Sequence, residues 1–227
     1  MMLKAVLFDM DGTLIDSEGF YVRIWQEVLE QYDLFITGDK LLANLGGKTD
    51  FQAFGVLQNE FGFTGTRDSL LIQIHQLVAE KLRTEVIPLM PGVQEIIQYL
   101  SDQRIRMAVV TSSKREISEL HLDRHGMLPH FEFLITRNDV ESTKPAPEPY
   151  LKALEKLRLP ASECLVLEDS STGLAAAQAA EVPCVVIQHY EAIRQMIPAG
   201  SQIFNDLLEV RDYIASSISI TKSSSRR

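Results

Sequence analysis

Two acidic residues spaced two apart follow a short apolar segment near the start of the chain. Asp9 and Asp11 come directly after the run Ala5-Val6-Leu7-Phe8. In an extended backbone, residues two apart lie on the same side, so both carboxylates can face one substrate. One carboxylate can attack phosphorus to form an aspartyl phosphate. The second can protonate the leaving oxygen and later activate water.

Three further polar segments follow apolar runs that are typical of buried strands. Thr111 and Ser112 follow the run 105–110, Lys144 follows the run 131–135 after a turn, and Glu168 and Asp169 follow the run 164–167. Parallel strands of an open α/β sheet present their carboxyl ends, where ligands bind, at one edge. We therefore expect these side chains to gather with Asp9 and Asp11.

Each segment alone has an ordinary structural explanation. The acids at 9 and 11 could form a turn after a strand, Thr111 and Ser112 could cap a helix, and Lys144 could be a surface lysine. Adjacent carboxylates after an apolar strand are harder to explain, because they repel each other unless a cation is present. The combination favours a phosphoryl-transfer site, in which hydroxyls and cations stabilise the charge on the transferred group.

Magnesium is the cation that this set of oxygen ligands predicts. It prefers a few carboxylates or carbonyls together with water and substrate phosphate. Asp9 and Asp169 can supply carboxylates, and the chain between Asp9 and Gly12 can supply a carbonyl. Thr111 can donate a hydrogen bond to a phosphoryl oxygen, and Lys144 can neutralise developing charge.

The elements that must position these residues alternate between strand and helix after position 89, which predicts an α/β fold with a doubly wound parallel sheet. Residues 16–88 show helical spacing of apolar residues and predict an inserted bundle of about four helices. We expect an α/β core at 1–15 and 89–215, a helical cap at 16–88, and an irregular polar tail at 216–227.

Composition limits the possible partners. A formal net charge of −9 over 227 residues argues against nucleic acid, but a small phosphorylated metabolite needs few cations. Cys164 and Cys184 lack metal-ligand spacing and are expected to be buried thiols. No apolar run reaches the length of a membrane span and no signal peptide is evident, so we expect a cytoplasmic protein without a membrane partner. A monomer is the default expectation for the oligomeric state.

The four polar segments together resemble the ordered motifs of the haloacid dehalogenase-like superfamily. Asp9-Met10-Asp11-Gly12-Thr13 resembles the first motif, Val110-Thr111-Ser112 the second, Lys144-Pro145 the third, and Glu168-Asp169-Ser170 with Gly173 the fourth. The resemblance covers nearly the whole chain and implies a Rossmann-like core. The helical insert resembles the C1 cap of the branch containing β-phosphoglucomutase and phosphoglycolate phosphatase.

The resemblance also implies a function for each residue. Asp9 would be the nucleophile and Asp11 the general acid and base, with Thr111 and Lys144 completing the catalytic set. The resemblance further implies a Mg²⁺ site formed by Asp9, Asp11, Glu168 and Asp169, in which Glu168 is either a ligand or an anchor behind the ligands. It also implies a phosphate site formed by Asp11, Gly12, Thr111, Ser112 and Lys144. Haloacid dehalogenases themselves lack the second acid, so Asp11 argues against that reaction.

A phosphatase acting on a small phosphate monoester is the expected function. The alternatives are a β-phosphoglucomutase-like mutase and a non-catalytic phosphometabolite-binding protein. The chain has Tyr21 where the mutases carry a histidine on the first cap helix. The lysine and arginine of the mutase cap loop are not at matching positions here, where the loop offers one cation, Lys48. Candidate substrate contacts are Glu18, Tyr21, Gly46, Gly47 and Lys48, although the glycine pair could also simply end a helix.

Overall fold

The computed structural model describes residues 2–45 and 50–224 of the chain. These residues divide into two compact units, each of which is described by itself. The sheet unit comprises 1–15, 89–189 and 196–227, and the helical unit comprises 16–88 and 190–195. Gly46, Gly47 and Lys48, three of the predicted substrate contacts, lie outside the described residues.

The sheet unit contains a six-stranded parallel sheet with the order β3-β2-β1-β4-β5-β6. The strands are β1 (Ala5–Phe8), β2 (Arg106–Val110), β3 (Leu134–Ile135), β4 (Cys164–Glu168), β5 (Cys184–Ile187) and β6 (Ile203–Phe204). The chain runs outward from β1 through β2 to β3, then returns to place β4 on the other side of β1. This reversal makes the fold doubly wound, and its topological switch point lies between β1 and β4.

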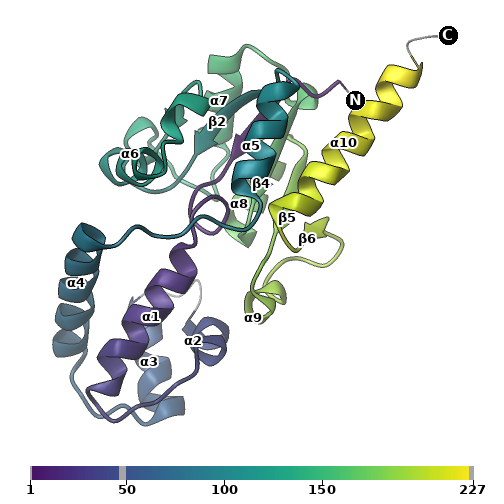
Figure 1. Cartoon of the computed structure of the whole chain (residues 1–227). Helices are drawn as coiled ribbons and strands as arrows, with labels where there is room; N and C mark the ends of the chain where they lie inside the picture. The colour runs from purple at the N-terminus through teal and green to yellow at the C-terminus, as the bar shows by residue number, and fades with distance from the viewer. Residues whose placement is uncertain (1, 46–49, 225–227) are drawn as a thin grey trace. The chain divides into compact units, whose positions relative to one another are not determined.

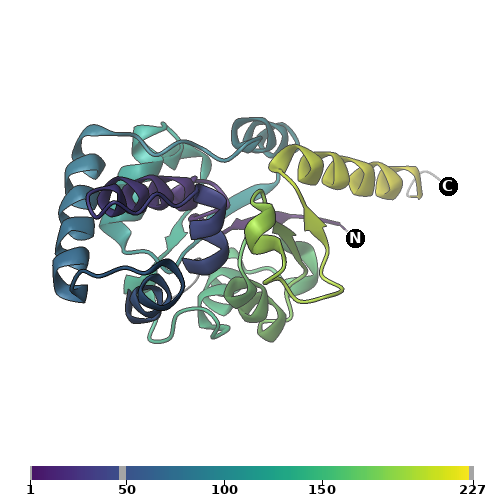
Figure 2. The same ribbon diagram turned by 90° about the horizontal axis from the view of Figure 1, so that it is seen from below.

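Helices cover the sheet, as the alternation of elements predicted. They are α5 (Val93–Asp102), α6 (Arg115–Arg124), α7 (Glu148–Leu157), α8 (Ser171–Ala179) and α10 (Leu207–Ser224), with short 3₁₀ turns at Leu128–His130, Arg137–Asp139 and Ala161–Glu163. Helices α5 and α10 lie side by side (Figures 1 and 2). The predicted α/β class and parallel sheet are therefore confirmed.

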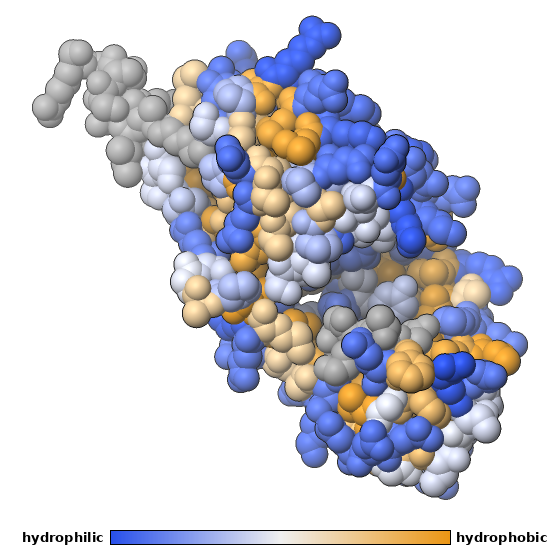
Figure 3. All heavy atoms as spheres, turned by 180° about the vertical axis from the view of Figure 1, so that it is seen from behind, coloured by the Kyte–Doolittle hydropathy of each residue, from blue (hydrophilic) through white to orange (hydrophobic). Residues whose placement is uncertain are grey.

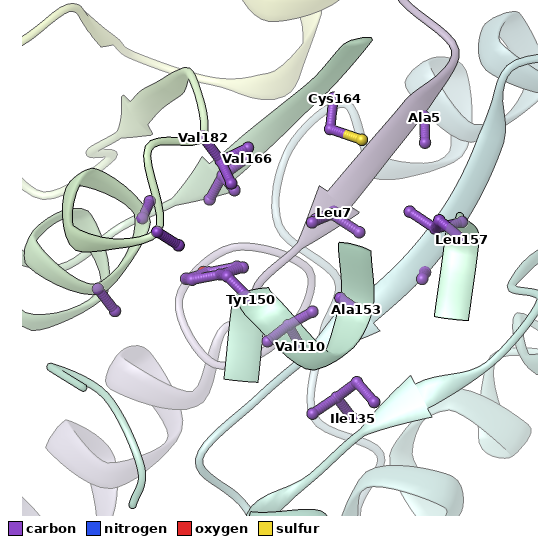
Figure 4. Packing of buried hydrophobic residues seen from close by; sticks show 14 residues of the cluster. Ala5, Leu7, Val110, Ile135, Tyr150, Ala153, Leu157, Cys164, Val166 and Val182 are labelled. Carbon is purple, nitrogen blue, oxygen red and sulfur yellow. The ribbon is translucent and has the colours of Figure 1, made fainter. Parts of the chain in front are cut away.

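Alternate residues of the central strands build the core that supports the site. Leu7 of β1 and Val166 of β4 project to one face of the sheet, where they join Tyr150 and Ala153 of α7 and small residues of α8 (Figure 4). Each fully buried leucine-sized side chain contributes about 1.5–3 kcal/mol to folding. Because β1 is packed in this way and paired on both edges, the loop that follows it starts from a fixed position.

The structure differs from the sequence prediction at the C-terminal end and at one short strand. Helix α10 extends to Ser224, so the prediction of an irregular tail is wrong for residues 216–224. No glycine or proline interrupts 207–224, and nothing in the sequence therefore stops the helix. Strand β3 is limited to Leu134–Ile135, shorter than the apolar run 131–135, and a 3₁₀ turn at Leu128–His130 precedes that run.

The helical unit contains α1 (Ser17–Glu30), α2 (Gly38–Leu45), α3 (Asp50–Phe61), α4 (Arg67–Thr84) and the short α9 (Glu191–Arg194). Asp16 caps α1 by accepting a hydrogen bond from the backbone N–H of Gly19 at 2.9 Å. The sequence placed 190–195 in the core domain, but the structure groups this segment with the helices. The reason is that α9 packs on α2 and the Tyr190 hydroxyl donates to Asp16 Oδ1 at 2.5 Å.

The surface is of mixed polarity. On the face shown in Figure 3, hydrophilic residues are interspersed with small groups of apolar ones, as on most folded proteins. Within 2–45 and 50–224, no helix has the length and hydrophobicity that crossing a membrane requires.

Candidate active site

The catalytic candidates follow three adjacent strands at the centre of the sheet. Asp9 follows β1, Thr111 follows β2, and Glu168 is the last residue of β4. The backbone N–H of Asp9 donates to the carbonyl of Leu167 at 2.9 Å, which extends the β1–β4 pairing to the start of the site. The site therefore lies at the carboxyl end of the sheet, at the topological switch point.

Lys144 connects the two buried acids. Its Nζ lies 2.5 Å from Asp9 Oδ1 and 2.5 Å from Glu168 Oε1, and it also donates to the carbonyl of Val110 at 2.7 Å. An ammonium group has three protons to donate, so these acceptors use its full capacity. The side chains of Lys144 and Glu168 are 5% and 0% exposed. Lys144 is therefore a buried, paired cation and not an ordinary surface lysine.

Burial and charge act in opposite directions on these groups. Burial raises the pKa of Asp9 well above its ordinary value, and Glu168 and Asp11 add to this effect, whereas Lys144 opposes it. Burial alone would lower the pKa of Lys144, but the charges of Asp9 and Glu168 raise it overall. Lys144 thus stays protonated, and additional positive charge near Asp9 would favour the ionised form of the Asp9 carboxylate.

Glu168 is fixed by hydrogen bonds to both of its oxygens. Oε1 accepts from Lys144 and from the hydroxyl of Tyr150 at 2.5 Å, and Oε2 accepts from the Ser170 hydroxyl at 3.2 Å. Burial and the Glu168 charge raise the pKa of Tyr150, so its phenol remains a donor. The sequence analysis missed Tyr150, because its position six residues after Lys144 in an amphipathic helix predicts only that the side chain is buried.

The acids at this edge fit a divalent cation. Ligand atoms of Asp9, Glu168 and Asp169 all lie within 4.8 Å of one another, and hard oxygen donors of this kind suit Mg²⁺. Both oxygens of Glu168 already accept hydrogen bonds, one of them from Lys144, so Glu168 anchors the Lys144 side chain. Gly12, with a φ of 83°, brings the loop so close to Asp169 that a Cβ at position 12 would overlap its carboxylate.

The loop after β2 contributes hydroxyl groups. Thr111 is buried, and its Oγ1 accepts a hydrogen bond from the backbone N–H of Ser113 at 3.0 Å. Accepting this bond leaves the Thr111 hydroxyl proton to be donated to a ligand. Ser112 is exposed, and Ser113 donates from its Oγ to Asp11 Oδ2 at 2.6 Å. The sequence analysis did not single out Ser113.

The structure thus brings Asp9, Lys144, Glu168 and Asp169 together, and joins Asp11 to the β2 loop through Ser113. Glu18 and Tyr21 lie on α1 of the helical unit, where Tyr21 is 44% exposed and packs edge-on against Phe20. His121 on α6 is buried, and burial lowers its pKa while the charge of Asp11 acts in the opposite direction.

Comparison with known proteins identifies the family that this fold and site define. Residues 6–187 match the family described as haloacid dehalogenase-like hydrolase. The chain belongs to this family of hydrolases, and the resemblance seen in its motifs is confirmed.

Named relatives cover nearly the whole chain. It is 28% identical over 219 residues to a phosphorylated carbohydrates phosphatase of Thermotoga maritima, with 92% of this chain and 100% of the relative covered. It is 31% identical over 216 residues to a validoxylamine A 7'-phosphate phosphatase of Streptomyces hygroscopicus subsp. limoneus, with coverage of 92% and 97%.

A solved structure shares the fold. The crystal structure of a haloacid dehalogenase family hydrolase from Deinococcus radiodurans, with bound phosphate and sodium, superimposes with a TM-score of 0.82 at 24% identity. The alignment covers 95% of this chain and 96% of that one. At this level of identity, the likeness concerns the fold.

Proposed function

We propose that this protein is a magnesium-dependent phosphatase that hydrolyses small phosphate monoesters, such as sugar phosphates, through an aspartyl phosphate on Asp9. The observation that carries the proposal is the contact of Lys144 with both Asp9 and Glu168 at 2.5 Å, deep in the site. Such a cation next to a buried carboxylate is suited to a reaction in which negative charge arrives on phosphoryl oxygens.

In the first step, Asp9 attacks phosphorus through a carboxylate oxygen, and the ester P–O bond breaks. Asp11 donates a proton to the departing oxygen, so that the product leaves as a neutral alcohol. Thr111 donates a hydrogen bond to a phosphoryl oxygen, and Lys144 balances the charge. The main-chain groups at Gly12 and Ser112 are the further phosphate contacts that we propose.

In the second step, Asp11 accepts a proton from water as the water oxygen attacks phosphorus. The bond between phosphorus and Asp9 breaks, which returns the carboxylate and releases inorganic phosphate. Mg²⁺, held by Asp9, Asp169 and the Asp11 carbonyl, would supply positive charge that draws the phosphate to the nucleophile. Glu168 keeps Lys144 in position throughout.

The helical unit is proposed to act as the cap that selects the substrate. Glu18 and Tyr21 on α1, together with Gly46, Gly47 and Lys48, are the proposed contacts with the organic part of the substrate. A small phosphorylated carbohydrate is consistent with the name of the Thermotoga maritima relative, a phosphorylated carbohydrates phosphatase, and with the acidic net charge of −9, which disfavours polyanionic nucleic acid.

The test is phosphate release from a panel of monoesters with Mg²⁺ and with EDTA, using the wild type and Asp9→Asn. We expect metal-dependent turnover that Asp9→Asn abolishes, because an amide is not a nucleophile here. Asp102→Asn is the matched control, since Asp102 is exposed on α5, and it should retain full activity. Turnover that survives Asp9→Asn, or that ignores EDTA, would refute the mechanism. Isomerisation of a sugar phosphate without phosphate release would instead identify a mutase.

A further inference from the structure

The hydroxyl of Ser113 and the carboxylate of Asp11 form a hydrogen bond between residues 102 positions apart in the sequence. Ser113 Oγ donates to Asp11 Oδ2 at 2.6 Å. Both residues belong to the sheet unit and follow adjacent strands, β1 and β2. A hydroxyl bound to a carboxylate is a charge-assisted hydrogen bond, which is stronger than a neutral one.

The backbone of Ser113 is held on both sides. Its N–H donates to Thr111 Oγ1 at 3.0 Å, and its carbonyl accepts from the backbone N–H of Arg137 at 3.0 Å. The chain then enters α6 at Lys114, the N-cap residue, in an extended conformation. Because these bonds fix the main chain, the Ser113 hydroxyl is pre-organised toward Asp11, as a supporting group must be to hold a side chain in productive geometry.

We propose that Ser113 is a positioning residue for Asp11, and that it makes Oδ1 the oxygen that transfers the proton. This inference rests on the proposed function. A carboxylate has two oxygens, and rotation of the side chain can present either one. The bond from Ser113 engages Oδ2 and restrains that rotation, so Oδ1 carries the proton to the leaving oxygen and accepts one from water afterwards. Ser113 itself exchanges no proton with the substrate.

Proton donation matters most when the leaving oxygen is basic. An alkoxide such as that of a sugar leaves poorly without a proton, whereas p-nitrophenolate leaves readily without one. A group that orients Asp11 must therefore affect alkyl phosphates more than p-nitrophenyl phosphate. A residue that merely keeps the β2 loop folded would affect both substrates equally.

The test compares kcat/KM of Ser113→Ala for an alkyl phosphate substrate and for p-nitrophenyl phosphate, because kcat/KM covers the steps up to departure of the leaving group. General acid–base catalysis contributes about 10²–10⁴-fold, and we expect misorientation to remove roughly 10- to 100-fold of this for the alkyl ester. The loss for p-nitrophenyl phosphate should be less than about threefold. Ser113→Thr, which keeps the hydroxyl, should restore most of the difference.

Two further variants separate positioning from folding. Ser118→Ala is the matched control, because the Ser118 hydroxyl donates to the Lys114 carbonyl within α6 rather than to a carboxylate, and it should behave as wild type. In an Asp11→Asn background, Ser113→Ala should cause almost no further loss, since residues that act through one another are not additive.

Equal losses of kcat/KM on both substrates, or a full additional loss in the Asp11→Asn background, would overturn the positioning proposal. Neither result would contradict the proposed phosphatase function. If the wild type releases no phosphate from any ester, the proposed function fails first, and the inference about Ser113 fails with it. Thermal unfolding of each variant identifies any loss that arises from misfolding.

Discussion

The carboxylate of Glu168 occupies the space that a Cβ on residue 173 would need, so Gly173 allows helix α8 to begin directly against this buried acid. Glu168 points to this face because it ends β4 on the same side as Val166, which packs under α7 and α8. The glycine therefore serves the placement of Glu168, and through it the placement of Lys144.

Replacement of Gly173 by alanine should destabilise the protein, although alanine favours helices. We expect Gly173→Ala to lower the free energy of unfolding by about 1–3 kcal/mol, as overpacking does, and to reduce turnover by displacing Glu168. Gly55→Ala is the control, because Gly55 lies within α3 with no atom close to where a Cβ would be; it should raise stability by roughly 0.5–1 kcal/mol. Urea unfolding measures both, and a stabilising Gly173→Ala would contradict the overlap.

Removal of the Tyr150 hydroxyl should weaken the anchor behind the site. Tyr150 is fully buried and donates to Glu168 Oε1. Tyr150→Phe keeps the ring that packs in the core and should cost about 1.5–3 kcal/mol, the range for hydrogen bonds to charged groups. Tyr213→Phe, at a partly exposed ring on α10, should cost close to nothing in the same urea titration. Equal midpoints for the two variants would show that Glu168 does not depend on Tyr150.

Loss of the Lys144 charge should leave two buried acids facing each other. We expect Lys144→Met to lower the free energy of unfolding in EDTA by about 3–5 kcal/mol, as breaking a buried ion pair does, and to abolish turnover. Lys4→Met is the control, because Lys4 pairs with Glu163 at 2.8 Å while its side chain remains 41% exposed; exposed pairs contribute about 0–1 kcal/mol.

Magnesium should compensate part of the Lys144→Met loss, since a cation bound to the native state stabilises it by mass action. The rise in melting temperature on adding Mg²⁺ should then exceed that of the wild type. A variant that is as stable as the wild type in EDTA would indicate that Asp9 and Glu168 are not both ionised in the native protein.

Asp139 should make stability depend on pH in the acid range. Burial alone would raise the pKa of Asp139, but hydrogen bonds from Thr136 and the charge of Arg115 outweigh it and lower the pKa overall. A carboxyl group with a lowered pKa contributes stability above its unfolded pKa and loses it as pH falls through the folded pKa. The contribution should therefore be complete at neutral pH.

The Asp139 contribution is measured by comparing the wild type with Asp139→Asn by urea unfolding. We expect a difference of about 1–3 kcal/mol at pH 7 that shrinks as pH falls below the unfolded pKa of the carboxyl group and through its lowered folded pKa. Other carboxyl groups titrate in both proteins and cancel in the difference. A difference that stays constant with pH would mean that the charge of Asp139 is not what stabilises the turn at 137–139.

The sequence predicted the sheet well because its signals are local. An apolar run such as Ala5–Phe8 that stops abruptly at Asp9 defines both a buried strand and its functional end. Parallel strands then bring distant polar segments to one edge, so Asp9, Lys144, Glu168 and Asp169 could be grouped without coordinates. The motif resemblance added the expected reaction.

Other features depend on tertiary contacts that no local pattern records. Ser113 is one of several hydroxyls in its loop, and only the fold shows that its Oγ meets Asp11. Tyr150 follows the period of an ordinary core residue until its hydroxyl is seen to reach Glu168. The segment 190–195 has no compositional boundary at either end, so its packing with α2 could not be read from the chain.

This last segment limits how the protein can be recombined with its relatives. A chimera that exchanges only 16–88 would replace Asp16 and α2 while retaining Tyr190 and α9, which contact them. Transplanted helices would thus meet a foreign tyrosine and a foreign helix surface. Grafts intended to transfer substrate preference should carry two pieces of sequence, 16–88 and 190–195, and the modular unit of this protein is discontinuous.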